Sequence, residues 1–87
     1  MDREGFVKAI QAKIKHRIEN GYSDMNRLDV EQIGRKVQMS PDEAADCFMD
    51  VRGRVWEGKV VPRSDRSWTG VTFDPEWLWR HYGIRPL

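Results

Sequence analysis

The sequence predicts a mainly α-helical domain with one small β-hairpin, which places it in the α+β class. Three observations lead to this prediction. Apolar residues recur at helical spacing through most of the chain before Gly58. Residues that cap helices precede several of these apolar stretches. After Gly58 the spacing changes to that of two short strands, and 87 residues suffice for one domain, residues 1–87.

The first predicted helix covers residues 3–19. Its apolar residues recur every four positions and form one face: Phe6, Ile10, Ile14 and Ile18. Charged side chains occupy the opposite face, so one side of this helix is expected to be buried. Asn20-Gly21 ends it, because glycine readily adopts the left-handed conformation that closes a helix.

The second predicted helix covers residues 30–37. Asp29 is its expected N-cap, and Gln32 three residues later completes a capping box. Leu28 precedes the cap and is expected to pack on Ile33, as in a hydrophobic staple. The apolar stripe of this helix comprises Val30, Ile33 and Val37.

The third predicted helix covers residues 41–57 and has the strongest start signal. Ser40 is the expected N-cap, Pro41 takes the first helical position and Glu43 reaches back to the cap. Its buried side comprises Ala44, Cys47, Phe48, Val51 and Val55. Only two residues connect it to the second helix, which predicts a sharp turn between the two.

A hairpin over residues 59–73 and a last helix over residues 75–82 complete the prediction. Two β-type runs flank residues 62–67, which have the composition of a turn. Asp74 and Pro75 begin the last helix, and Gly83 closes it. The order helix, helix, helix, hairpin, helix is that of a winged helix-turn-helix domain.

The residues also resemble the gluconate-repressor (GntR) type of winged-helix transcription factor over about residues 10–73. The matching positions are Ile14, Ile18, Gly21-Tyr22, Leu28, Ile33-Gly34, Val37, Met39-Ser40, Gly58-Lys59-Val60-Val61 and Gly70-Val71-Thr72-Phe73. The resemblance implies three helices, a two- or three-stranded wing and a short strand at Arg27-Leu28. Because nearly all matching positions are core or turn positions, the resemblance bears on fold more than on function.

The chain departs from that family where the family contacts DNA. The family has Arg and Thr residues in the second helix and at the start of the third. Here the corresponding residues are Glu31 or Gln32, then Pro41, Asp42, Glu43 and Ala45. Three residues are inserted before Gly58, which is expected to lengthen or kink the third helix around Gly53. The family's effector domain has no counterpart, so ligand sensing of that type is not expected.

Basic residues predict a DNA interface around the wing. The formal net charge is +1, with eight basic against ten acidic residues in 1–50 and seven against four in 51–87. The candidate DNA-binding residues are Arg35, Lys36, Arg52, Arg54, Lys59, Arg63 and Arg66. Arginine suits phosphate and minor-groove contact, so we expect a small DNA-binding transcriptional regulator acting as a homodimer. The alternative is a solvated hairpin whose charges protect an edge strand.

Carboxylates on the third helix favour a second hypothesis, a protein-interaction module. Asp42 and Glu43 suit the first turn of any helix, but Asp46 and Asp50 lie beyond it and would be repelled by DNA phosphates. They are therefore candidate partner-binding residues. RNA is a weaker alternative, because the sequence lacks the paired aromatic motif that stacks bases.

Two tryptophans near the C-terminus are further candidate partner-binding residues. Trp77 and Trp79 are two positions apart, so on one helix they point in different directions. One of them is expected to pack over the hairpin while the other lies partly exposed. They form either a satellite core or an anchor for a partner or second copy.

No sequence feature predicts catalysis, a cofactor or a metal ion. His16 and His81 lie on different helices, without Cys or carboxylate residues at metal-ligand spacing. No apolar run is long enough to span a membrane, and no signal peptide is recognised. Cys47 is the single cysteine and falls on a buried helix face, so disulfides are excluded and a cytoplasmic location is expected.

Overall fold

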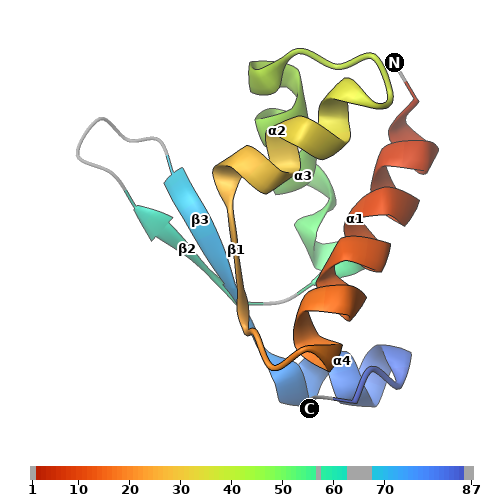
Figure 1. The fold of residues 1–87 in the computed structure, drawn as a ribbon, viewed down its shortest axis with the longest axis vertical. Helices are drawn as coiled ribbons and strands as arrows, with labels where there is room; N and C mark the ends of the chain where they lie inside the picture. Colours follow the sequence, from red (N-terminus) through yellow and green to blue (C-terminus); the bar gives the residue numbers. More distant parts are fainter. Residues whose placement is uncertain (1, 57, 63–67, 86–87) are drawn as a thin grey trace.

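Helices and a small antiparallel sheet make up the computed structural model, which describes residues 2–56, 58–62 and 68–85 (Figure 1). The helices are α1 (Arg3–Glu19), α2 (Arg27–Arg35), α3 (Pro41–Val55) and α4 (Pro75–Tyr82). The strands are β1 (Asp24–Asn26), β2 (Gly58–Pro62) and β3 (Trp68–Phe73). This confirms the mainly helical α+β class. The β2–β3 hairpin extends away from the helices, and α4 lies at the end of the molecule opposite the turn between α2 and α3 (Figure 1).

The sheet has the order β1-β3-β2, and both pairings are antiparallel. In β3, Val71 lies opposite Met25 of β1 on one side and Val60 of β2 on the other. Gly70 permits the close approach of β1, because a Cβ atom there would lie 3.0 Å from the carbonyl oxygen of Met25. The short strand expected at Arg27-Leu28 is therefore present, but it lies three residues earlier.

Helix α1 has the predicted bounds, and its apolar face is buried. The Asp2 carboxylate caps its first turn by accepting a 2.9 Å hydrogen bond from the Gly5 amide. Gly21 has a φ of 86°, and the adjacent amides donate to carbonyls in the last turn of the helix. The amphipathic pattern and the terminating glycine thus determined this element locally.

Helix α2 begins at Arg27 rather than at residue 30, which corrects the prediction from Asp29. Asn26 is the N-cap: its Oδ1 accepts from the Asp29 amide at 2.9 Å, and Asp29 Oδ2 accepts from the Asn26 amide at 3.2 Å. Asp29 is thus the third residue of a reciprocal capping box, and Gln32 has no part in it. Leu28, expected against Ile33, is 64% exposed because it now lies within the helix rather than before its cap.

The C-terminal end of α2 also differs from the prediction. The helix ends at Arg35, and a turn follows in which Gln38 has a φ of 66°. Val37 lies beyond the helix and is only partly buried. The Met39 amide donates to the Gly34 carbonyl at 3.0 Å, which holds the turn against the end of α2.

Helix α3 begins as predicted and ends two residues early. Ser40 Oγ accepts from the Glu43 amide at 3.2 Å, and Glu43 Oε1 accepts from the Ser40 amide at 3.4 Å. The helix continues through Gly53 and ends at Val55, where Trp56 turns into an extended conformation. The last residue expected in the helix, Glu57, lies outside the described residues.

Trp56 is a core residue, although the buried side predicted for the third helix did not include it. Its side chain is 1% exposed, and its indole Nε1 donates to the Thr72 carbonyl at 2.7 Å. The rings of Trp56 and Phe48 stack with centroids 5.4 Å apart, and Phe73 packs edge-on against Trp56 at 6.4 Å. Phe48 also contacts Trp68 at 5.7 Å. These aromatic contacts join α3 to the sheet.

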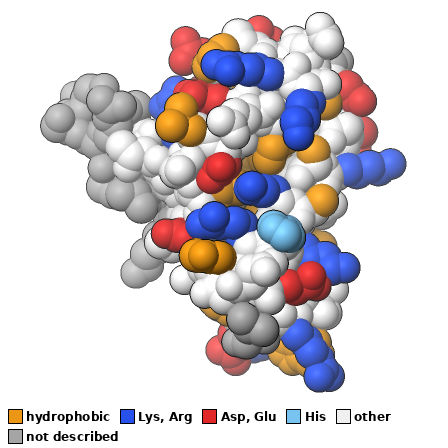
Figure 2. All heavy atoms as spheres, viewed as in Figure 1, with side chains coloured by type: hydrophobic (Ala, Val, Ile, Leu, Met, Phe, Trp, Pro, Cys, Tyr) orange, Lys and Arg blue, Asp and Glu red, His pale blue; other side chains and the backbone are white. Residues whose placement is uncertain are grey.

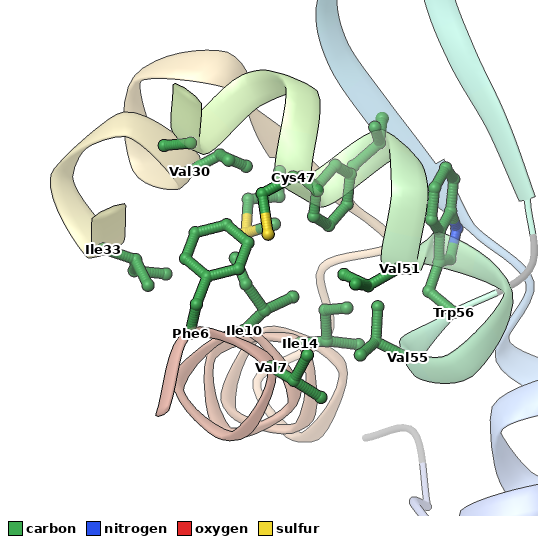
Figure 3. Close-up of a cluster of buried hydrophobic side chains, with 14 of the residues drawn as sticks. Phe6, Val7, Ile10, Ile14, Val30, Ile33, Cys47, Val51, Val55 and Trp56 are labelled. Carbon is green, nitrogen blue, oxygen red and sulfur yellow. The ribbon is translucent and has the colours of Figure 1, made fainter. Parts of the chain in front are cut away.

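The main core lies where α1, α2 and α3 face one another (Figure 3). Side chains from all three helices point inward, among them Phe6, Ile10 and Ile14 of α1, Val30 and Ile33 of α2, and Cys47, Val51 and Val55 of α3. Every one of them belongs to an apolar stripe that the sequence spacing predicted. Packing of these stripes fixes the angle between the helices and so positions the surfaces described below.

Helix α4 has the predicted bounds and packs through one side. Asp74 Oδ1 accepts from the amides of Glu76 and Trp77, and Gly83 closes the helix with a φ of 66°. Leu78 and the following Ile84 are buried. Among the described residues, no helix combines the length and apolar composition that a membrane crossing requires.

Candidate nucleic-acid interface

Arg27 occupies the point where α2, α3 and the hairpin meet. Its Nε donates to Glu31 Oε1 at 3.2 Å, and Nη2 donates to Asp42 Oδ1 at 3.5 Å. Its Nη1 donates to the Trp68 carbonyl at 3.5 Å, and the guanidinium carbon lies 5.3 Å from the centroid of the Trp68 ring. One side chain therefore links the first turns of both helices to the first residue of β3.

The sequence prediction did not single out Arg27. It placed the residue in a strand, where the spacing to Glu31 has no significance. With Asn26 as the N-cap, Arg27 and Glu31 both lie in α2. They form an i,i+4 pair, and side chains at this spacing face each other on a helix. Arg27 and Trp68 are 41 residues apart in the sequence, so no local sequence pattern predicts their contact.

Of the two candidate basic residues on α3, Arg52 is the one that lies on the side of Phe48. It follows Phe48 by one helical turn, and Phe48 packs on Trp56 and Trp68. Arg52 therefore extends from the flank of α3 that faces the sheet. Its side chain is exposed and has no ion-pair partner among the residues that the structure describes.

Arg54 points to a different side of α3. Its Nη2 donates to Glu4 of α1 at 3.3 Å, and its carbonyl accepts from Gln11 Nε2 at 3.4 Å and from the Tyr82 hydroxyl. Two residues correspond to about 200° around a helix, so Arg52 and Arg54 face apart. The structure therefore does not bring Arg54 together with the candidate residues near the hairpin.

The remaining basic candidates divide between the far end of α2 and the hairpin. Arg35 and Lys36 lie at the end of α2 away from the Arg27 junction, exposed and without ion-pair partners in the described ranges. The backbone of Lys59 belongs to β2, opposite Thr72 of β3. The side chain of Lys59 and the whole of Arg63 and Arg66 lie outside what the structure describes.

The acidic face of α3, defined as Asp42, Glu43, Asp46 and Asp50, is exposed. Asp42 faces Arg27, and Asp50 Oδ2 lies 3.6 Å from Arg3 Nη2. Asp46 has no cationic neighbour within ion-pair distance in the described part of the chain. Exposed ion pairs contribute at most about 1 kcal/mol, so the acidic face remains repulsive toward phosphate.

Trp77 and Trp79 separate as their spacing predicts. Trp77 is half-buried against the core and stacks on His81 with ring centroids 4.2 Å apart. Trp79 is 42% exposed, and the Arg85 guanidinium lies 4.7 Å from its ring centroid. Trp79 is therefore the more accessible of the two for a partner.

Cys47 is buried between the helices, as its position on the apolar stripe of α3 predicted. Burial raises the pKa of its thiol; nearby Arg3 opposes this shift and Asp50 reinforces it. Over the described ranges, no three His, Cys, Asp or Glu side chains lie close enough together to hold a metal ion.

No protein-family model, no curated protein and no solved structure matches this chain. Its function must therefore be inferred from the geometry of its own residues.

Proposed function

We propose that the chain is a small winged helix-turn-helix protein that binds double-stranded DNA and regulates transcription. The order of elements supports this fold, since a helix pair is followed by a hairpin and β1 adds a third strand beside β3. The fold alone does not establish function. Binding is therefore assigned to particular residues, on the flank of α3 that adjoins the hairpin.

The proposal depends on one observation, the position of Arg52. It is exposed on the sheet-facing flank of α3, and no carboxylate among the described residues competes for its charge. A guanidinium in that position is free to bind phosphate oxygens, which supply most of the affinity in protein–DNA complexes. The hairpin beside it carries Lys59, Arg63 and Arg66 in its sequence.

The acidic face of α3 determines how the domain would approach DNA. A helix inserted in the major groove is surrounded by phosphates, and Asp46 would be repelled there without a compensating cation. Contact through the hairpin and the Arg52 flank avoids this repulsion. Arg27 supports the same geometry, because it ties Trp68, the first residue of β3, to both helices of the pair.

A matched pair of arginine variants tests the proposal. Arg52→Ala should weaken binding to duplexes of any sequence severalfold and should reduce the slope of log affinity against log salt by about 1. Arg54→Ala removes the same charge from the same helix but on the α1 side, so its affinity should stay close to wild type. Fluorescence anisotropy titrations measure both. Equal losses in the two variants would show a general charge effect and would contradict the assigned surface.

A protein-interaction role is the second candidate, favoured by Asp46, which is exposed and has no ion-pair partner in the described part of the chain. The double reversal Asp46→Lys with Asp50→Lys separates the two functions. A protein partner bound to the acidic face would be lost, whereas DNA affinity should be equal to wild type or higher.

A further inference from the structure

A groove of about 400 Å³ lies between α1 and α2, on the face shown in Figure 2. Apolar side chains line its floor: Ala9 and Ala12 of α1 and Ile33 of α2. Basic side chains border it: Lys13 and His16 of α1 and Lys36, which directly follows α2. Figure 2 shows hydrophobic side chains gathered between the two helices, with Lys, Arg and His side chains beside them.

The groove carries a net positive charge. Lys13 and Lys36 have no ion-pair partners among the described residues. The carboxylate in the groove belongs to Asp29, which is engaged with the Asn26 amide in the cap of α2. An apolar floor between two free ammonium groups suits a segment that combines carboxylates with a small number of apolar side chains.

The acidic face of α3 has this chemistry. Asp46 is exposed and has no ion-pair partner among the described residues, and Met49, one turn along the same side, is only partly buried. Gly53 follows after one more turn, and a Cβ atom there would meet nothing within 4 Å. A helix with glycine on its outer side lets another helix approach its backbone closely.

We propose that the acidic face of α3 in one copy of the chain docks into the α1–α2 groove of a second copy. Asp46 and Asp50 would face Lys13 and Lys36, while Met49 would cover the apolar floor. The groove and the acidic face are different surfaces of one chain, so the contact is head-to-tail and each copy can join two others. The Arg52 flank takes no part, so this inference goes beyond DNA binding and does not depend on it.

Sedimentation velocity of the full chain at low salt, without DNA, tests the contact. Wild type should associate as its concentration rises and dissociate as salt is added. The variants Lys13→Glu/Lys36→Glu and Asp46→Lys/Asp50→Lys should each weaken association at least about tenfold, because each replaces attraction with repulsion. An equimolar mixture of the two should associate again, since the reversed groove then meets the reversed face.

A control variant and four possible outcomes test the proposal. Lys8→Glu changes an exposed charge of α1 outside the groove and should leave association unchanged, and circular dichroism should show that every variant is folded. A wild-type chain that remains monomeric at low salt would overturn the proposal. So would association that survives the reversals, or a mixture that fails to associate. Loss of association in the groove variant alone would also overturn it, since a different occupant would then be indicated.

Discussion

At the scale of single residues, Arg27 shows how one guanidinium can organise three elements. It is 23% exposed at its side chain, and Glu31 beside it is 17% exposed. Partly buried ion pairs are screened less than surface pairs, and a carboxylate left without its partner there is costly. The stacking of Arg27 on Trp68 adds contact with the hairpin.

Arg27→Ala is expected to lower the free energy of unfolding by about 1–2 kcal/mol, because Glu31 loses its partner and Trp68 loses a packing surface. Arg35→Ala is the matched control on the same helix, since Arg35 is exposed and unpaired among the described residues. It should change stability by less than about 0.5 kcal/mol. Urea unfolding followed by tryptophan fluorescence measures both. Similarly small losses of stability in both variants would contradict the stabilising role assigned to Arg27.

Cys47 predicts a dependence of stability on pH. Because burial raises the pKa of its thiol, the unfolded chain loses the thiol proton at a lower pH than the folded chain. The folded state then binds more protons, so stability falls as pH rises above about 8.5, the usual thiol pKa. Cys47→Ala should reduce this fall, measured by urea unfolding at pH values on both sides. If the stability of the wild type and of Cys47→Ala depended on pH in the same way, a contribution from the Cys47 thiol would be contradicted.

At the scale of elements, the helices that the sequence predicted well are those whose signals are local. The bounds of α1 and α4 follow from apolar spacing and terminating glycines. The start of α2 could not be predicted in this way, because Asn26 and Asp29 are both competent caps. Pairing of β1 with β3, which carries the chain as far as Asn26, decides between them. That pairing joins segments far apart in sequence.

The cap of α2 gives a prediction that separates the two alternatives. Asn26→Ala should cost about 1 kcal/mol of folding stability, because the Asp29 amide loses its acceptor. Gln32→Ala removes the residue that a cap at Asp29 would have used, and its cost should be below about 0.5 kcal/mol. Thermal unfolding followed by circular dichroism compares them. A larger loss of stability in Gln32→Ala than in Asn26→Ala would instead indicate that Asp29 is the N-cap of the helix.

At the scale of the whole molecule, charges of opposite sign occupy separate surfaces. The acidic face lies on α3, the basic groove lies between α1 and α2, and Arg52 adjoins the sheet. Sequence alone could not sort the arginines among these surfaces. Arg52 and Arg54 look alike in the sequence, yet among the described residues only Arg54 has a carboxylate partner, Glu4, which lies 50 residues away. Burial of Trp56 was missed for a similar reason, since the acceptor of its indole hydrogen bond is a carbonyl of β3.

The salt dependence of DNA binding tests the central claim most directly. The measurement is an anisotropy titration of random-sequence duplex DNA with the wild-type chain at about 50 and about 200 mM salt. One phosphate contact each from Arg52, Lys59, Arg63 and Arg66 predicts that affinity falls about 150-fold between the two conditions. Equal affinity at both salt concentrations, or no binding at the lower one, would contradict the claim that this domain binds DNA through the Arg52 flank and the hairpin.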